Sequence, residues 1–435
     1  MLEKSNIERI MNEINTKYLI IGAGISGLMF ANMKKKDYII VEKENEIGGY
    51  CRTIYQDGFI WDYAGHFFHF KTQEMKDFFM ENMKDEVLIE QNKNTKIYYR
   101  GEMIDYPFQT NIHQLEKQEF IECLYDLFNK VEKEEYESFL DMLYGKFGKS
   151  IVEKFLKPYN EKLYACDLNT LDKEAMGRFF PYANINQIIN NMKEEKNKSY
   201  NDKFLYPQNG AKSFLDKLYN NLDKNNVMLN TKIISIDYEQ KVAITNNNQR
   251  IKYEYLINTA PLNKFLNIDA NNENKNKENK EMIDRLSYNK VLVFNLGFEK
   301  KSDFDEHWIY FPDKNINFYR VGFYDNILNS DRLSMYIEIG YNKHDENIDV
   351  EKQLKETLEN LEKIGIVKDN KLMSYSTILM DPAYVHIQSE TNVEVDEWKE
   401  KMAKNQIYSI GRYGGWTYCS MEDSMLAAKK LAEKI

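Results

Sequence analysis

The sequence predicts an α/β fold of two or three domains, and three observations support it. Residues 17–42 give an apolar run, a glycine-rich turn, a helical stretch and a second apolar run, the pattern of an opening βαβ unit. From about 111 to 200, apolar residues recur at helical spacing. Residues 288–340 give several aromatic-rich strands. We therefore expect a Rossmann-type domain, a helical insertion domain and an antiparallel β-sheet domain.

The length of 435 residues is too great for one simple core. We expect these boundaries: a discontinuous Rossmann-type domain at 17–110, 202–266 and 395–435, a helical domain at 111–201, and an antiparallel sheet domain at 283–394. The run at 267–282 is of low complexity and almost entirely polar, so we expect a solvated loop there.

Composition narrows the class of partner and the compartment. The net charge of −10 argues against a nucleic-acid partner, although a local basic pocket for a phosphorylated ligand remains compatible with it. No stretch approaches the roughly 20 apolar residues of a membrane span. The charged start lacks the apolar core of a secretory signal. Four cysteines are widely scattered, which suits a reduced, cytoplasmic protein.

A metal site is not expected from this sequence. His66 and His69 share the i, i+3 spacing of some metal pairs, but no Cys, His or acidic cluster completes a ligand set beside them.

The stretch "KYLIIGAGISGLMFA" carries the first chemical motif. An apolar strand leads into Gly22, Gly24 and Gly27, and a helix follows. Such glycines permit a tight turn, a close approach of the backbone to a pyrophosphate, and close helix–strand packing. Glu42 ends the next strand, where it can accept hydrogen bonds from a ribose. Together these features predict a dinucleotide site.

A second glycine pair follows in "ENEIGGYCRT". It resembles the glycine–glycine signature of flavoproteins related to amine oxidases, where it lies along the FAD pyrophosphate and approaches the ring. That resemblance implicates Gly48, Gly49 and Arg52, and it favours FAD over NAD.

Further segments occur in a characteristic order along most of residues 17–430. They are "GFIWDYAGHFFHF", "IDYPFQTNI", "KPYNEKLY", "NDKFLYPQNGAKSFL", "HWIYFPDKNINFYRVGF" and "GRYGGWTYCSMEDS". Together they resemble the UDP-galactopyranose mutase family, in both its bacterial and its eukaryotic forms. On the flavin side, the resemblance places His66 at the flavin ring and Arg412 at the start of a segment that wraps the flavin. Its ribityl-side continuation would be Met421, Glu422 and Asp423.

On the substrate side, the resemblance implies a site shared by the helical and sheet domains. Arg320 would grip a diphosphate, Tyr418 would bond the same group, and Arg178 is open as a second diphosphate arginine. With His66, these three are the expected catalytic residues. The other expected substrate contacts are Tyr106 and Gln109 around a proline, Tyr159 on the nucleotide base, Tyr164 where many bacterial members have tryptophan, Asn201 near the sugar, and Tyr384 near a phosphate.

Arg320 lies in "NINFYRVGF", whose alternation predicts a strand with Phe318, Arg320 and Gly322 on one face. The alternative is a solvated strand arginine. Only nine of the 59 basic residues are arginines, so we expect arginine where a planar, bidentate fork is needed.

The resemblance implies an isomerase that contracts the pyranose ring of a nucleotide-diphosphate sugar. In that family, N5 of reduced FAD attacks the anomeric carbon, so an external reductant such as NAD(P)H or a reductase is needed. The partner would be a nucleotide sugar, and a homo-oligomer is possible. Two alternatives stay open: an oxidase of the amine-oxidase or protoporphyrinogen-oxidase type, and a non-catalytic binding protein on the same scaffold.

Overall fold

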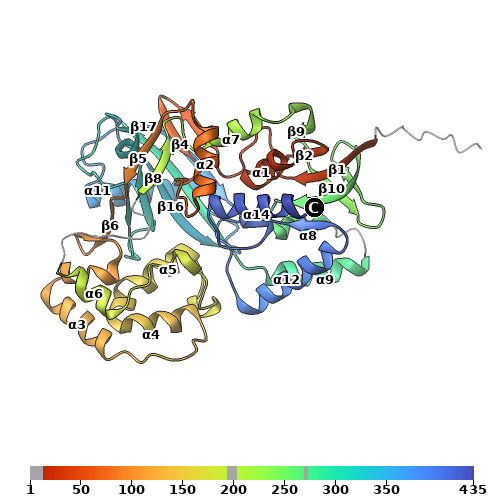
Figure 1. The fold of residues 1–435 in the computed structure, drawn as a ribbon. Helices are drawn as coiled ribbons and strands as arrows, with labels where there is room; N and C mark the ends of the chain where they lie inside the picture. Colours follow the sequence, from red (N-terminus) through yellow and green to blue (C-terminus); the bar gives the residue numbers. More distant parts are fainter. Residues whose placement is uncertain (1–12, 194–202, 269–272) are drawn as a thin grey trace, which may run out of the picture.

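A seven-stranded sheet forms one half of the molecule in the computed structural model, which describes residues 13–193, 203–268 and 273–435 (Figure 1). Its order is β10-β11-β12-β1-β2-β9, with β18 beside β12. The strands are β1 (Glu13–Ile21), β2 (Tyr38–Val41), β9 (Val227–Met228), β10 (Ile233–Asp237), β11 (Val242–Thr245), β12 (Arg250–Asn258) and β18 (Ile407–Ser409). β1 runs parallel to both β2 and β12, so the carboxyl ends of these strands share one edge.

Helices cover both faces of this sheet, as the apolar composition of β2 requires. On one face lie α1 (Ile25–Lys34), α7 (Lys212–Asn220) and α14 (Met421–Lys434). On the other lie α8 (Leu262–Ile268) and α12 (Ser389–Ala403). The fold is therefore the α/β, Rossmann-type arrangement that the glycine turn predicted.

A second seven-stranded sheet forms the other half, in the order β17-β13-β16-β15-β14-β6-β7. Its strands are β6 (Thr95–Tyr99), β7 (Glu102–Asp105), β13 (Asn289–Phe298), β14 (Trp308–Tyr310), β15 (Arg320–Phe323), β16 (Ser334–Asn342) and β17 (Leu372–Met380). All its pairings are antiparallel except that of β14 with β6. The helices α10 (Tyr324–Leu328) and α11 (Val350–Ile364) belong to this half.

One predicted boundary is wrong. The sequence analysis assigned residues up to 110 to the Rossmann-type domain, but β6 and β7 pair into the antiparallel sheet, next to β14. β7 pairs with its neighbour β6, but β6 pairs with β14, where Thr95 lies opposite Trp308, so no local pattern could have revealed that this hairpin joins the antiparallel sheet. The strand β15 also begins later than expected, at Arg320.

The helical insertion lies to one side of both sheets (Figure 1). It contains α3 (Lys117–Phe128), α4 (Phe139–Ile151), a π-helical turn (Val152–Leu156), α5 (Lys157–Tyr164) and α6 (Ile185–Asn191). Ile97 of β6 and Tyr319 before β15 are part of its apolar core. The insertion therefore packs directly on the edge of the antiparallel sheet that carries Arg320.

The remaining elements connect these bodies. They are β3 (Thr53–Gln56), β4 (Phe59–Asp62), β5 (Leu88–Asn92), β8 (Lys203–Pro207), α2 (Gln73–Asn82), α9 (Glu273–Arg285) and α13 (Gly411–Gly414). Short 3-10 turns occur at Phe108–Thr110, Ile112–Gln114, Leu168–Thr170, Gly177–Phe179 and Lys224–Asn226.

The predicted loop at 267–282 is also wrong, because Glu273–Arg285 is helix α9. Met282 is buried and packs in a cluster with Leu262, Leu286 and Trp416. Ile283 packs against the same cluster, so two apolar residues anchor a helix that is otherwise polar, which is why composition alone indicated a loop.

Candidate active site

The first glycine turn lies at the carboxyl end of β1. Gly22 has φ of +100°, and a Cβ on Gly27 would lie 2.0 Å from the carbonyl oxygen of Gly22, so both positions need glycine. Buried Glu42 at the end of β2 accepts a hydrogen bond from the N–H of Ala23 at 2.8 Å. The carboxylate thus fixes the turn whose N–H groups would face a pyrophosphate.

The second glycine pair joins the first. Gly48 donates its N–H to the carbonyl of Ala23 at 2.9 Å. A Cβ on Gly49 would lie 3.4 Å from the Cα of Gly24, so the two backbones are in close approach. Arg52 is buried, donates to the carbonyl of Glu46 at 2.9 Å, and its Nε has no hydrogen-bond partner. The predicted residues therefore form one continuous cradle.

The segment before α14 completes the cradle. A Cβ on Gly411 would lie 2.3 Å from Oγ of Ser26 on α1, so this segment contacts the helix that follows the first glycine turn. Arg412 donates to the carbonyl of Cys419 at 3.1 Å, and its buried Nε has no hydrogen-bond partner. Nε of Arg52 also lies 3.7 Å from a carboxylate oxygen of Glu46, so Arg412 is the arginine whose buried donor has no acidic partner here. A glycine cradle beside such a donor fits an anionic dinucleotide such as FAD.

His66 is held in a neutral state. Its Nδ1 lies 2.9 Å from the carbonyl oxygen of Ala64, which fixes Nδ1 as the protonated nitrogen. Burial lowers the pKa of His66 to about 4, against the smaller opposing effect of that hydrogen bond. The imidazole is therefore uncharged near pH 7, and its Nε2 carries no proton.

A cavity of about 990 Å³ lies where the three bodies meet. Five residues predicted for the site line it: Tyr106, Arg178, Arg320, Met421 and Glu422. Lys71 and Lys93 also line it, so basic side chains outnumber the acidic Glu422. Such a lining suits an anionic ligand.

Arg320 is not a solvated strand arginine. Its side chain is 20% exposed, and that of its partner Glu338 is 2% exposed. Nε and Nη2 of Arg320 donate to the two carboxylate oxygens of Glu338 at 2.8 and 2.6 Å, across the β15–β16 ladder. Burial alone would lower the pKa of Arg320, but the carboxylate raises it well above its ordinary value. The fork holds the guanidinium rigidly, and Nη1 takes no part in the pair.

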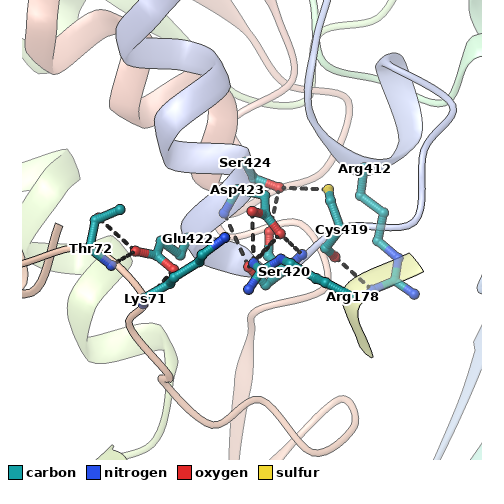
Figure 2. Close-up of polar contacts among 9 residues, drawn as sticks. All are labelled: Lys71, Thr72, Arg178, Arg412, Cys419, Ser420, Glu422, Asp423 and Ser424. Carbon is teal, nitrogen blue, oxygen red and sulfur yellow. Dashed lines mark hydrogen bonds and ion pairs between the residues drawn. The ribbon is translucent and has the colours of Figure 1, made fainter. Parts of the chain in front are cut away.

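Arg178 is held by a different device, shown in Figure 2. Its Nη2 donates to both carboxylate oxygens of Asp423, at 2.8 and 2.7 Å, and approaches Oγ of Ser420 at 3.3 Å. Ser420 and Asp423 form the capping box at the start of α14. Arg178 and Asp423 are 29% and 31% exposed, so this pair is more accessible than that of Arg320.

Glu422 has a structural role beside this pair. Its carboxylate accepts hydrogen bonds from the N–H groups of Lys71 and Thr72 at 2.8 Å, and from the Thr72 hydroxyl at 2.7 Å (Figure 2). The side chain therefore fixes the two residues before α2, whose own N-cap is Thr72. A contact of Glu422 with FAD stays a prediction. Because the carboxylate is already bonded, we expect that contact from the backbone of Glu422.

Aromatic rings surround the arginines. The ring centroid of Tyr310 lies 5.2 Å from that of Tyr106 and 5.1 Å from that of Tyr159. Tyr384 and Tyr418 stack at 5.8 Å, with the guanidinium of Arg412 at 4.9 and 5.0 Å from their rings. Tyr106 and Tyr310 line the cavity, and Tyr159 packs against Tyr310 from outside the lining.

Among the described residues, five predicted substrate contacts do not line the cavity: Gln109, Tyr159, Tyr164, Tyr384 and Tyr418. Gln109 is fully buried and donates its amide to the carbonyl of Pro181. Tyr164 is also fully buried, with its ring 5.8 Å from that of His386. Asn201 lies outside the described residues. Gln109 and Tyr164 shape the insertion rather than line the cavity.

Sequence reasoning missed Glu338 and Lys93. Glu338 had a visible signal, because a single carboxylate interrupts the buried strand "SMYIEIGY" and a buried carboxylate needs a cationic partner. Lys93 had none, since it follows β5 among polar residues and reaches the cavity only through the fold. Its ammonium lies 4.9 Å from the ring centroid of Tyr106.

The described residues contain neither a metal cluster nor a membrane-spanning helix. Among those that the structure describes, no group of three or more His, Cys, Asp or Glu side chains could hold a metal ion. In that part of the chain no helix has the length and apolar character to cross a bilayer. The four cysteines, Cys51, Cys123, Cys166 and Cys419, are all free thiols.

Comparison with solved structures reveals the same fold in several flavoproteins. A reduced UDP-galactopyranose mutase matches with a TM-score of 0.89 and 22% identity, over 96% of this chain and 93% of the other. A protein from Exiguobacterium sp. 255-15, provisionally named a protoporphyrinogen oxidase, matches with a TM-score of 0.76 and 16% identity, over 96% and 98%. A putrescine oxidase bound to putrescine matches with a TM-score of 0.66 and 13% identity, over 97% and 99%.

A family model covers nearly the whole chain. Residues 25–435 match the model described as flavin containing amine oxidoreductase. This span includes the second glycine pair, the cavity residues and the segment before α14, although it begins after the first glycines. The protein is an enzyme of the flavin containing amine oxidoreductase family, and its cofactor is FAD.

Proposed function

We propose that this enzyme interconverts the pyranose and furanose forms of a nucleotide-diphosphate sugar, with UDP-galactose as the nearest model. The observation that carries the proposal is Arg320 on the cavity wall, forked onto buried Glu338 and surrounded by tyrosines. A diphosphate carries about two negative charges and several acceptor oxygens, which a fixed guanidinium binds well. The likeness to UDP-galactopyranose mutase over the whole chain supports the same proposal.

In this proposal, reduced FAD supplies the nucleophile for the anomeric carbon, and the protein positions the sugar and its leaving group. Arg320 and Tyr418 hold the diphosphate, and Arg178 contributes a second cation from the opposite wall. These groups offset the negative charge that grows as the diphosphate leaves. Tyr159 and Tyr106 offer ring faces for the nucleotide base. Holding both parts in place can lower the activation barrier by up to about 7–11 kcal/mol.

An amine or porphyrinogen oxidase is the second candidate, favoured by the likeness to those two flavoproteins. The cavity lining argues against an amine substrate. Arg178 and Arg320 are paired with Asp423 and Glu338, so the remaining charge of the lining comes from Lys71 and Lys93. The one acid in the lining, Glu422, already accepts hydrogen bonds from the N–H groups of Lys71 and Thr72. A cationic amine would be repelled by this surface, whereas a diphosphate would be attracted.

One experiment separates the two candidates. The FAD-loaded protein is reduced with dithionite under anaerobic conditions and incubated with a panel of nucleotide sugars, and products are resolved by chromatography. We expect a furanose product at many turnovers per reducing equivalent, and no product from the oxidised protein. Equal activity of the oxidised protein, or hydrogen peroxide formed in step with product in air, would instead support an oxidase.

A further inference from the structure

We propose that Lys162 is a positioning residue that clamps helix α5, which carries Tyr159, to the β14–β15 hairpin, which carries Arg320. The clamp rests on contacts within this chain, and its effect on ligand binding rests on the proposed function. The sequence did not predict Lys162 as a site residue, and its side chain does not line the cavity.

The geometry of the ammonium group supports this role. Nζ of Lys162 donates to the carbonyl oxygens of Phe311, Asp313 and Phe318 at 2.8, 2.8 and 2.5 Å. Burial lowers the pKa of Lys162 to about 7. The three carbonyl acceptors match the three N–H donors of the protonated form, which is the form that makes the clamp. Phe311 directly follows β14, and Phe318 stands two residues before Arg320. One side chain therefore bonds both arms of the hairpin.

The helix end beside Lys162 is itself fixed to the antiparallel sheet. The carbonyls of Leu163, Tyr164 and Ala165 accept hydrogen bonds from side chains of the sheet half, namely Asn289, His386 and Asn342. These are the carbonyls that a helix end leaves without partners. Because α5 is anchored in this way, Lys162 projects from a fixed point, and the hairpin is the element that it orders.

The clamp connects the two ends of the proposed ligand site. Tyr159 lies one helical turn before Lys162, and its ring contacts Tyr310 of β14 at 5.1 Å and Tyr319 at 6.3 Å. Replacing the ammonium by an apolar group would leave three carbonyls without their donor and would loosen the hairpin on α5, where the ring contacts of Tyr159 remain. The separation between Tyr159 and Arg320 would then vary, and a ligand that contacts both would bind less tightly.

The chain offers a matched control for this contact. Lys314 in the same hairpin pairs with Glu161 of α5 at 2.6 Å, but its side chain is 67% exposed. Lys314→Met removes an α5–hairpin contact of the same charge without touching the three carbonyls. Such an exposed pair contributes little.

The test compares FAD-loaded wild type, Lys162→Met, Lys162→Arg and Lys314→Met by hydrogen exchange with mass spectrometry and by titration with UDP. The reporter amides are Phe311 and Tyr319, which donate to the carbonyls of Tyr319 and Glu338. In Lys162→Met we expect these amides to exchange at least tenfold faster and UDP to bind at least tenfold more weakly. Lys162→Arg should recover part of both losses, and Lys314→Met should stay within twofold of wild type.

Unchanged exchange in Lys162→Met would overturn the clamp, and faster exchange with wild-type UDP affinity would overturn its positioning role. Where Lys162→Met does not fold, Lys162→Arg gives the same comparison at smaller amplitude. A wild-type protein that holds FAD but binds no UDP would contradict the proposed function, while the exchange data would still decide whether the clamp exists.

Discussion

The two walls of the cavity each present an arginine paired with a carboxylate, yet they hold it differently. On the sheet wall, Arg320 and Glu338 face each other across two paired strands and are 20% and 2% exposed. On the insertion wall, Arg178 stands in a short 3-10 turn and pairs with Asp423 of α14, both about 30% exposed. The first pair lies within one sheet, whereas the second bridges two separate bodies.

This difference separates a permanent contact from one that can be exchanged. A buried pair cannot lose one partner without leaving a charge in a poorly solvated place. A partly exposed pair is close to neutral in free energy, so a ligand oxygen can replace the carboxylate at small cost. We therefore expect Arg320 to form a fixed part of the site and Arg178 to change partner when an anionic ligand binds.

The largest expected effect is on the stability of the sheet wall. Arg320→Ala leaves Glu338 buried and unpaired, so the free energy of unfolding should fall by about 3–5 kcal/mol. Denaturant titration of the FAD-loaded protein measures this. Arg332→Ala is the control, because Arg332 bonds the carbonyls of Asp57 and Gly58 at the surface. Equal, small decreases in the free energy of unfolding of both variants would show that the pairing of Arg320 with Glu338 does not stabilise the sheet wall.

A milder change tests the ligand role of the same wall. Arg320→Lys keeps the charge opposite Glu338 but removes the planar fork, so kcat/KM for the sugar nucleotide should fall about tenfold to a hundredfold, or ~1.4–2.7 kcal/mol. Arg332→Lys should stay within twofold. Steady-state kinetics with the reduced enzyme provides the measurement, and wild-type kinetics in Arg320→Lys would remove Arg320 from the ligand site.

On the insertion wall we expect a small change in stability and a gain in affinity. Asp423→Asn removes the ion pair with Arg178 and should change the free energy of unfolding by about 1 kcal/mol or less. Because the carboxylate no longer competes for Arg178, UDP should bind up to about tenfold more tightly in calorimetric titration.

Glu433→Gln makes the same charge change on an exposed part of α14 and serves as the control, since Glu433 pairs only peripherally with Lys429. Weaker binding of UDP in Asp423→Asn, with normal binding in Glu433→Gln, would contradict the exchange of partners.

The smallest expected effect is on the stability of the protein at low pH. Burial tends to raise the pKa of Asp423, but hydrogen bonds from the Ser420 N–H and from Arg178 lower it below its ordinary value of 3.8. The contribution of Asp423 to stability is therefore present above about pH 3.8 and is lost as pH falls through the lowered pKa. The stability difference between wild type and Asp423→Asn should stay constant from pH 7 to 5. A difference that disappears by pH 5 would show that the carboxylate is not held in this way.

The sequence predicted the flavin half more fully than the substrate half. The glycine turn, Glu42 and the second glycine pair are local patterns, and each follows from the backbone requirements of a few neighbouring residues. The pairings Arg320–Glu338 and Arg178–Asp423 join residues 18 and 245 positions apart. The type of residue could be predicted at such positions, but not its partner.

The predicted boundary at residue 110 and the predicted loop at 267–282 were wrong for a related reason. The strands β6 and β7 are short, and nothing in their composition says which sheet edge they join. Helix α9 depends on the burial of Met282 against residues distant in sequence, which outweighs its polar composition. Tertiary packing decided these elements, whereas local propensity decided α1 and β2.

The order of the chain has a consequence for how the molecule acquires its shape. Glu13 and Arg250 meet at the ends of β1 and β12 although 237 positions separate them, and Tyr18 reaches Ile435 across 417 positions. In the helical insertion, by contrast, Asp126 meets Ser150 across only 24 positions. Closing long loops slows folding, so the insertion should form early and the FAD cradle late. We therefore expect the yield of holoprotein during synthesis to depend on this late closure, and cooler expression with added riboflavin to raise it.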